Sequence, residues 1–162
     1  MKVLSKQNNS KMCVICGLEN DFGVKAPFYN MEDGSVITIF KYKKEHQSYP
    51  GRVHGGLICT MIDELIGRTL WVKEPNQYGV TMSINVKYRK IVPYDITLKG
   101  VGIMTKESDK FFEGEAKIYN QVNGELLAEG TAHYYKMPLN VIGSINQEDV
   151  NVYVPDEVKE IK

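Results

Sequence analysis

The feature that most limits how this chain can fold is one segment, residues 57–74, with the periodicity of a long helix. Apolar side chains recur there every three or four positions and cover most of the circumference: Leu57, Ile58, Cys59, Met61, Ile62, Leu65, Ile66, Leu70 and Trp71. A helix that is apolar on nearly all sides is usually buried in the middle of a domain. Pro75 and Asn76 predict its end.

The other regular segments alternate with a period of two, which predicts antiparallel strands with one covered face. Strands are expected from Phe28, with a turn at residues 32–34, and then over residues 36–42, 79–89, 95–106 and 111–119. Asn123-Gly124 predicts a hairpin. The pattern places Val80, Met82, Ile84, Val86 and Tyr88 on one face of one strand. In the last strand, the shared face is mostly small, which indicates close packing against it: Leu126, Ala128, Gly130, Ala132 and Tyr134.

One buried helix and a run of long antiparallel strands predict an α+β fold, in which a curved antiparallel sheet wraps around a long central helix. At 162 residues the chain is long enough for one domain with its own core. We interpret residues 1–12 as a loose N-terminal segment, residues 13–137 as the domain and residues 138–162 as a C-terminal extension. Such a domain leaves a sheet edge that dimerisation would pair.

Composition excludes several classes of function. Twenty basic and twenty acidic residues cancel, so no net charge favours a nucleic acid or an anionic membrane surface. No apolar run approaches the roughly 20 residues that span a bilayer, and the first residues lack the apolar core of a signal peptide. Three cysteines, an odd number, argue against a disulfide scaffold and fit a reducing cytoplasm.

The chemistry-bearing stretch is PGRVHGGLICTMIDELIG, residues 50–67. Gly55 and Gly56 directly precede the predicted helix, where a missing Cβ lets a ligand approach the backbone. The first amides of a helix have no internal partner and lie at the positive end of its dipole, so they suit the oxyanion of a thioester under attack. The alternative interpretation of the two glycines is a tight turn into the helix.

Two adjacent carboxylates within this helix differ in their surroundings. Glu64 has Arg68 four residues on, which predicts an ion pair on the helix surface. Asp63 has no cation at a neighbouring helical position, and an unpartnered carboxylate on an apolar helix is costly unless it is used. Burial would raise its pKa toward that of a general base. The alternative interpretation is a salt bridge to a distant segment.

Spacing along the helix predicts a dimer. Seven or eight residues separate the glycines from Asp63, which is more than about 10 Å at the helical rise. An attacking group must lie within roughly 3–3.5 Å of the carbonyl carbon. If both ends act on one thioester, Asp63 must come from a second copy of the chain.

The pattern His54-Gly55-Gly56 followed by Asp63, within YPGRVHGGLICTMIDELIG, resembles the phenylacetic-acid-degradation (PaaI-like) branch of the hotdog-fold thioesterase superfamily. It is also similar to eukaryotic thioesterase-superfamily members with PPGFAHGG-type loops. The resemblance covers about residues 13–136, and its specific part is residues 47–68. It implies a homodimer with shared sites, dimers that often pair into tetramers, and acyl-CoA hydrolysis without a metal or cofactor, coenzyme A being part of the substrate.

The resemblance also implies roles for individual residues. Asp63 would be the nucleophile or general base, the Gly55 amide would polarise the carbonyl, and His54 would orient the loop and the substrate. Thr81 matches a hydroxyl position that helps to place the attacking water. Several relatives carry an Asn six residues before the His, where this chain has Ser48. The adjacent Gln47 matches the glutamine of the PPGFAHGG-type loops, so it is expected to make the polar contact instead. Asp63, Gly55 and His54 are thus the expected catalytic residues. Gly56, Gln47, Ser48 and Thr81 are expected to bind the substrate.

Other features permit two interpretations. Lys87, Arg89 and Lys90 are expected to contact the phosphates of coenzyme A, or else to protect a solvated strand edge with charge. Cys13-x-x-Cys16 is expected to be structural, because zinc needs two more ligands and a redox pair would want a βαβ setting.

Two other functions share the fold: an enoyl-CoA hydratase or dehydratase, and a non-catalytic acyl-CoA binding module. His54 lies in the loop rather than in a hydratase-type Asp-x-x-x-x-His arrangement, which counts against the former.

Overall fold

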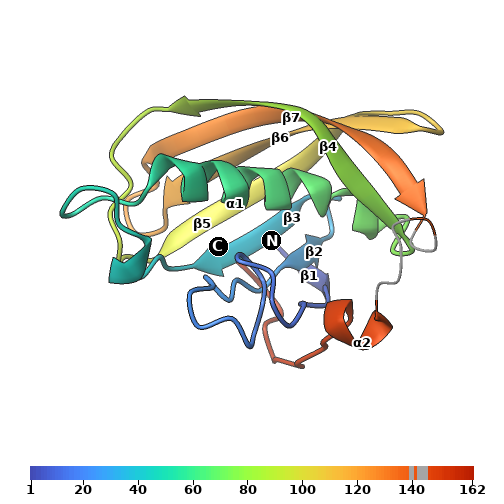
Figure 1. The fold of residues 1–162 in the computed structure, drawn as a ribbon, viewed down its shortest axis with the longest axis horizontal. Coiled ribbons are helices and arrows are strands. Elements are labelled where there is room, and N and C mark those ends of the chain that lie inside the picture. Colours follow the sequence, from blue (N-terminus) through green and yellow to red (C-terminus); the bar gives the residue numbers. More distant parts are fainter. Residues whose placement is uncertain (139–140, 142–145) are drawn as a thin grey trace.

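In the computed structural model, which describes residues 1–138, 141 and 146–162, a central helix crosses the concave face of a seven-stranded antiparallel sheet (Figure 1). The strands lie in the order β1-β2-β3-β5-β6-β7-β4. This confirms the predicted α+β class and the hotdog arrangement. The elements are β1 (Val3–Lys6), β2 (Tyr29–Met31), β3 (Val36–Phe40), η1 (Lys44–His46), α1 (Gly55–Gly67), η2 (Leu70–Val72), β4 (Gln77–Tyr88), β5 (Leu98–Glu107), β6 (Phe111–Asn120), β7 (Leu126–Pro138) and α2 (Gln147–Val150).

The central helix α1 is held by the sheet that curves around it. It contacts β3, β4, β5, β6 and β7, and its buried face consists of Ile58, Met61, Ile62, Leu65 and Ile66. Burying side chains of this size contributes about 1.5–3 kcal/mol each before entropy is counted. Most of the helix's stability therefore comes from packing in the sheet rather than from helix propensity.

The helix ends earlier than its periodicity predicts. We expected one helix over residues 57–74, whereas α1 stops at Gly67 and a separate 3₁₀ turn, η2, follows. The Thr69 hydroxyl donates a 2.6 Å hydrogen bond to the Ile66 carbonyl and competes with the helical pattern there. The Trp71 indole N–H then donates to the Gln77 carbonyl, which directs the chain into β4.

The predicted alternation along β4 is wrong at its beginning, because the strand contains a bulge. Thr81 pairs with Tyr134 and Ser83 pairs with His133, so Met82 is the extra residue between them. A single extra residue reverses the alternation. Val80 and Met82 are therefore exposed, at 41% and 61%, instead of sharing the inner face with Ile84, which packs against the core.

The small inner face of β7 is confirmed, and the helix is what packs against it. An added Cβ at Gly130 would lie 2.8 Å from Ile62 Cγ2, and one at Gly102 of β5 would lie 2.6 Å from the Leu65 carbonyl oxygen. These positions let the helix approach the sheet more closely than any larger residue would permit. The hairpin predicted at Asn123-Gly124 connects β6 to β7, with Gly124 at φ 72°.

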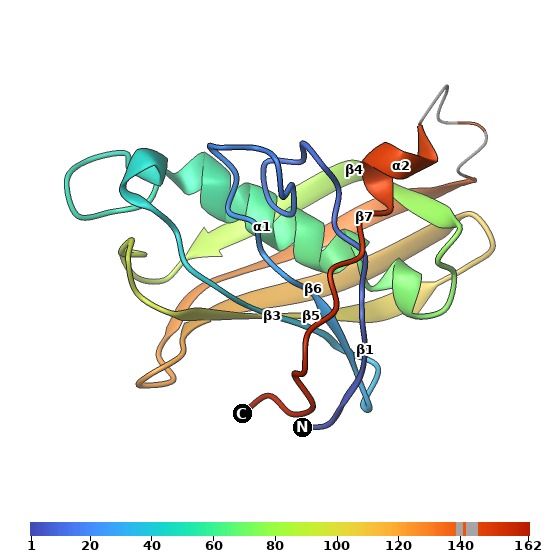
Figure 2. The same cartoon turned by 90° about the horizontal axis from the view of Figure 1, so that it is seen from below.

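Both termini pack against the rest of the fold. We expected residues 1–12 to be loose, and we assigned no structure to the tail after residue 138. Residues 3–6 form β1 at one end of the sheet. The tail returns to it, with a bridge between Lys2 and Glu160, and Ile161 is buried in a small cluster with Tyr29, Met31 and Ile37. Figure 2 shows the N-terminal segment, here the part of the chain between β1 and β2 (residues 7–28), lying over α1 on the side away from the sheet. In the described ranges, no helix has the length and apolar character needed to cross a membrane.

Candidate active site

The first part of the site is the N-terminus of α1. His54 is the N-cap residue, and its Nδ1 accepts a 2.9 Å hydrogen bond from the Gly56 N–H. The Gly55 N–H has no hydrogen-bond partner within the part of the chain that the structure describes. Because the cap satisfies Gly56 and leaves Gly55 unpaired, the one open donor at the positive helix end is the Gly55 amide.

The loop before the helix is tied at its base. Val53 donates a 2.8 Å backbone hydrogen bond to Val92, and His54 donates one of 2.9 Å to His46. Between these residues the chain turns through Gly51, at φ 82°. Gln47 and Ser48 are exposed on this loop. The structure thus places both predicted polar residues on the same loop as His54, with their side chains open to solvent.

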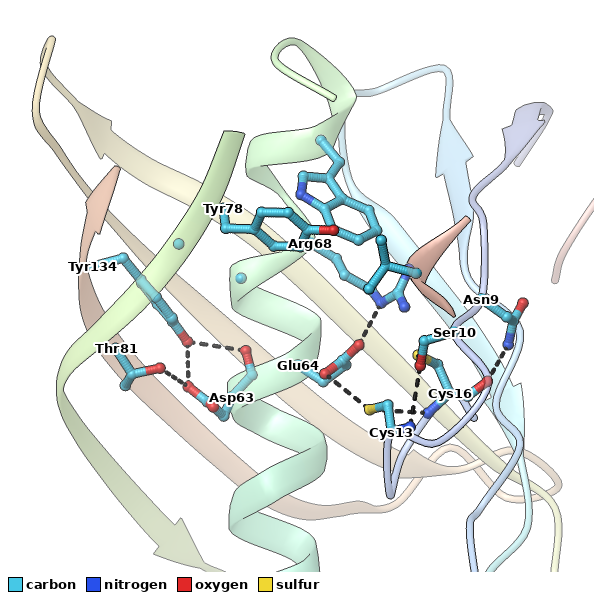
Figure 3. A pocket seen from close by; sticks show the side chains of 14 residues that line it. Asn9, Ser10, Cys13, Cys16, Asp63, Glu64, Arg68, Tyr78, Thr81 and Tyr134 are labelled. Carbon is cyan, nitrogen blue, oxygen red and sulfur yellow. Dashed lines mark hydrogen bonds and ion pairs between the residues drawn. The ribbon is translucent and has the colours of Figure 1, made fainter. Parts of the chain in front are cut away.

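The second part of the site is the carboxylate of Asp63, near the middle of α1. Its Oδ1 accepts a 2.9 Å hydrogen bond from the Thr81 hydroxyl and a 2.8 Å hydrogen bond from the Tyr134 hydroxyl (Figure 3). Its Oδ2 has no hydrogen-bond partner among the described residues. One oxygen is therefore fixed, and the other is left available for chemistry.

Thr81 reaches Asp63 because of the bulge in β4. Thr81 points toward α1 ahead of the bulge, and Ile84 packs against the core after it. With regular alternation, Thr81 and Ile84 would lie on opposite faces. Thr81 was among the predicted site residues, but the sequence gave no sign of a bulge beside it.

Tyr134 was not among the predicted site residues. It is 1% exposed, and its ring stacks on Phe112 with centroids 4.6 Å apart. Burial, together with the nearby Asp63 carboxylate, raises the pKa of the Tyr134 phenol well above its usual range. The hydroxyl therefore stays protonated as a donor to Asp63. The signal that could have found it is its size, since it is the large polar-tipped residue on an otherwise small inner face of β7.

A cavity of about 240 Å³ adjoins Asp63. Its walls come from α1, the beginning of β4, β7 and the N-terminal segment. Polar, aromatic and small residues line it: Asn9, Ser10, Cys13, Cys16, Asp63, Glu64, Gly67, Arg68, Trp71, Tyr78, Gly79, Thr81, Tyr134 and Val150. Gly55 and Gly56 are not part of this wall, so one chain does not bring the oxyanion donor and the carboxylate into one cavity.

The ion pair between Glu64 and Arg68 is confirmed, but it is not on the surface. Arg68 Nε lies 2.8 Å from Glu64 Oε1, and Arg68 is 3% exposed. Its guanidinium lies between two aromatic rings, 4.2 Å from the Phe28 centroid and 4.8 Å from that of Trp71. The N-terminal segment covers this side of the helix, which the local i,i+4 pattern does not reveal.

Figure 3 shows the adjacent carboxylates leaving α1 in different directions. Asp63 points to Thr81 and Tyr134, whereas Glu64 points to Arg68 and to the turn that carries Cys13 and Cys16. Cys13 Sγ lies 3.8 Å from Glu64 Oε2. A hydrogen bond between the two cysteines lowers the pKa of the Cys16 thiol and, together with burial, raises the pKa of the Cys13 thiol.

The basic residues at the end of β4 belong to the glycine part of the site. Tyr88 donates a 2.9 Å hydrogen bond to the Gly55 carbonyl, which places the end of β4 beside the N-terminus of α1. Arg89 Nε donates to Glu129 at 2.9 Å, and Lys90 lies 3.6 Å from Glu125. Lys87 lines a shallow hollow with Glu115, Lys117 and Glu129. Arg89 and Lys90 follow the strand end that contacts Gly55, whereas Lys87 lines a separate hollow with residues of β6 and β7. None of the three lines the cavity beside Asp63.

Part of the chain is similar to known thioesterase sequences. Residues 50–127 match the family model described as the thioesterase superfamily. Human acyl-coenzyme A thioesterase 13 is 26% identical over 97 residues, which are 60% of this chain and 69% of that protein. Mouse acyl-coenzyme A thioesterase THEM4 is 35% identical over 68 residues, and the match spans 42% of this chain but only 28% of the relative.

Solved structures show the same fold. Protein RHA08564 of the thioesterase superfamily aligns with a TM-score of 0.70 at 19% identity, over 76% of this chain and 63% of that one. Zebrafish thioesterase superfamily member 2 aligns with a TM-score of 0.65 at 20% identity, over 74% of this chain and 88% of that one. The BH2602 protein of Bacillus halodurans, solved with CoA, has a TM-score of 0.61 at 25% identity, over 70% of this chain and 75% of that one.

A long helix wrapped by an antiparallel sheet is the hotdog fold, which this chain shares with the solved thioesterase-superfamily proteins. In sequence, residues 50–127 are similar to the thioesterase superfamily.

Proposed function

We propose that this protein is an acyl-CoA thioesterase of the PaaI-like branch that acts in the cytoplasm. The observation that carries the proposal is the Asp63 carboxylate, with Oδ1 held by two hydroxyl donors and Oδ2 free beside a cavity. A carboxylate fixed by one oxygen has its other oxygen oriented for work as a base or nucleophile. Relatives named acyl-coenzyme A thioesterase support the substrate class.

In the base-assisted route, Asp63 Oδ2 takes a proton from a water molecule as the water oxygen attacks the thioester carbonyl carbon. The carbonyl electron pair moves to oxygen, and the Gly55 N–H together with the helix dipole stabilises that oxyanion. The intermediate collapses with cleavage of the C–S bond. The coenzyme A thiolate leaves and takes up a proton, and the carboxylic acid is the other product.

In the covalent route, Asp63 Oδ2 itself attacks the carbonyl carbon. Loss of the thiolate then leaves a mixed anhydride, and water hydrolyses it to regenerate the carboxylate. Both routes use the same two groups, and both need Asp63 unprotonated.

The two groups are proposed to come from different copies of the chain. The eight-residue interval from Gly55 to Asp63 spans about 12 Å of helix, too far for one carbonyl to contact both. Strand β4 ends the sheet and exposes Val80 and Met82 there. An unpaired edge with exposed apolar side chains favours association. A homodimer, or a pair of dimers, would bring Gly55 of one chain to Asp63 of the other.

The remaining predicted residues support binding at the glycine end. His54 holds the helix start through Gly56, and Gln47 and Ser48 border the same loop. Lys87, Arg89 and Lys90 lie on either side of Tyr88, whose hydroxyl contacts Gly55, and they would attract the phosphates of coenzyme A. Arg89 and Lys90 form ion pairs with Glu129 and Glu125. Phosphate binding by these two basic residues would therefore require them to leave their glutamate partners.

The test is thiol release from a panel of aryl, short-chain and long-chain acyl-CoAs. Asp63→Asn keeps the shape but removes the base, and we expect kcat to fall by about 10³-fold. Gly55→Pro removes the open amide at a helix position that accepts proline, after a His54 already extended at ψ 130°. We expect a loss of about 10²-fold from it, whereas the matched Gly55→Ala variant keeps the amide and stays active.

Three outcomes would contradict the proposal. Full activity of a folded Asp63→Asn variant would remove Asp63 from its role. Turnover at an enoyl double bond without thiol release would favour a hydratase. Binding of acyl-CoA without any turnover would favour a non-catalytic module.

A further inference from the structure

The turn at Cys13–Cys16 directs backbone amides at a cysteine sulfur. Cys13 Sγ accepts backbone N–H hydrogen bonds from Ile15 at 3.3 Å and from Cys16 at 3.5 Å. Gly17 closes the turn by donating to the Cys13 carbonyl at 2.8 Å. An added Cβ at Gly17 would lie 2.4 Å from that carbonyl oxygen, so only glycine fits. Amides directed at a sulfur can stabilise the negative charge that a metal-bound thiolate carries.

The fold supplies a third ligand from the central helix. The sulfurs of Cys13 and Cys16 and one carboxylate oxygen of Glu64 all lie within 4.8 Å of one another. The separation from Cys13 Sγ to Glu64 Oε2 is 3.8 Å. A tetrahedral ion with Zn–S near 2.3 Å and Zn–O near 2.1 Å holds a sulfur and an oxygen roughly 3.6 Å apart. The three groups are therefore spaced for one ion.

Surrounding groups complete the electrostatics of the cluster. Arg68 Nε donates to Glu64 Oε1 at 2.8 Å, which orients the carboxylate and leaves Oε2 toward the cysteines. The Ser10 hydroxyl accepts from the Cys13 N–H at 3.1 Å and lies 3.4 Å from Cys16 Sγ. Two thiolates, one carboxylate and a divalent cation sum to one negative charge, which the buried Arg68 guanidinium balances. A hydrogen-bonded outer layer of this kind is typical of metal sites.

We infer that Cys13, Cys16 and Glu64 bind a thiophilic divalent cation of the zinc type, with a fourth position open to the cavity beside Asp63. Two thiolates and one carboxylate in a tetrahedral arrangement favour zinc over the harder magnesium and calcium ions. The sequence offered only the two cysteines, which is why a structural role was expected for them. The third ligand is contributed by a helix that the N-terminal segment covers.

Such a site would hold two parts of the chain together. The cation would fasten the N-terminal segment to α1 at the residue next to Asp63, and it would hold one wall of the cavity in place. This inference does not depend on thioesterase activity, because its readouts are metal content and thiol protection.

The experiment is metal analysis of the full chain, purified with reductant and without an affinity tag that binds metals. We expect about one zinc ion per chain in the wild type. The Cys59→Ser variant is the matched control, because Cys59 lies on α1 outside the cluster. It should keep the ion, whereas Cys13→Ser and Cys16→Ser should lose it and Glu64→Gln should bind at least about tenfold more weakly.

Two further readouts protect the test against variants that fail to fold. Replacement of zinc by Co²⁺ in the wild type should give a thiolate-to-cobalt charge-transfer band in the near ultraviolet. Addition of a chelator should expose the Cys13 and Cys16 thiols to a thiol reagent that previously reached only Cys59. A reduced wild-type chain that binds neither ion would overturn the inference, as would a Cys13→Ser variant with unchanged metal content.

Discussion

The hydroxyl of Tyr134 lies 2.8 Å from Asp63 Oδ1 and 2.9 Å from the Asp63 main-chain carbonyl oxygen, within hydrogen-bonding reach of both. A residue of the last long strand thus fixes both the carboxylate and the backbone of the residue that we propose to be catalytic. The Tyr134 ring is itself held by its stack on Phe112. Because burial and the Asp63 carboxylate raise the pKa of this phenol, it stays protonated at neutral pH and can donate to Asp63.

Tyr134→Phe should reduce kcat by about 10–100-fold with little change in KM, because one hydrogen bond to a charged group is lost while the ring stack remains. Steady-state thiol release measures both constants. Tyr135→Phe is the matched control, since Tyr135 is 36% exposed and is not part of the cavity wall. An unchanged kcat in a folded Tyr134→Phe variant would show that Asp63 does not need this positioning.

Mixing two inactive variants tests whether the sites are shared. A dimer of one Asp63→Asn chain and one Gly55→Pro chain has one site with both native groups and one site with neither. Random exchange makes half the dimers mixed, so about a quarter of wild-type activity should return. The measurement is thiol release after joint refolding, with each variant refolded alone as the control. If mixing restores nothing although mixed dimers form, both groups must act within one chain.

Gly102→Ala should destabilise the fold by about 1–3 kcal/mol through overpacking, because its Cβ would lie 2.6 Å from the Leu65 carbonyl oxygen of α1. Neither backbone can move without shifting helix or sheet. Gly67→Ala serves as the comparison, since its Cβ would meet Tyr134 Cε1 at an ordinary 3.7 Å. Chemical denaturation should show no loss there, or a gain of up to about 1 kcal/mol from helix propensity. Equal losses in both variants would contradict the close approach.

Stability at low pH should depend on Glu107. Hydrogen bonds from Lys136 and Lys73 lower the pKa of Glu107 to about 2 in the folded chain, against about 4.3 for an unfolded glutamate. A depressed pKa contributes stability that is complete above about pH 4.3 and is lost as the pH falls toward 2. The free energy of unfolding should therefore fall less steeply between these values in Glu107→Gln.

Urea titrations from pH 2 to pH 7 would measure this slope. Asp109→Asn is the control, because Asp109 is exposed in the turn between β5 and β6 and forms no ion pair within the described residues. Its slope should match that of the wild type. A Glu107→Gln variant with the wild-type slope would mean that the Lys136 contact does not persist in solution. At neutral pH the same variant should be less stable than the wild type, because Lys136 is almost fully buried and loses one of its two carboxylate partners.

The sequence by itself determined the central helix and the long strands, and it pointed to the two groups that we propose to react. Helical periodicity identified α1 because the helix must be apolar wherever the sheet surrounds it. The small residues of β7 indicated a close approach that Gly130 and Ile62 do make. The glycines before the helix and the lone Asp63 were recognisable because such residues are costly or unusual at those positions. All of these signals act within a few residues of one another.

Only the tertiary structure decided which distant groups meet. The bulge at Met82 turns Thr81 toward Asp63, and Tyr134 approaches the same carboxylate from 71 residues away. Burial of Arg68, and the contact of Glu64 with Cys13, depend on the N-terminal segment covering the helix. Local periodicity reports which face of an element is covered, but it carries no information about the segment that covers it. That choice is made by packing the whole chain around one core, where a single inserted residue or a returning terminus changes the partners.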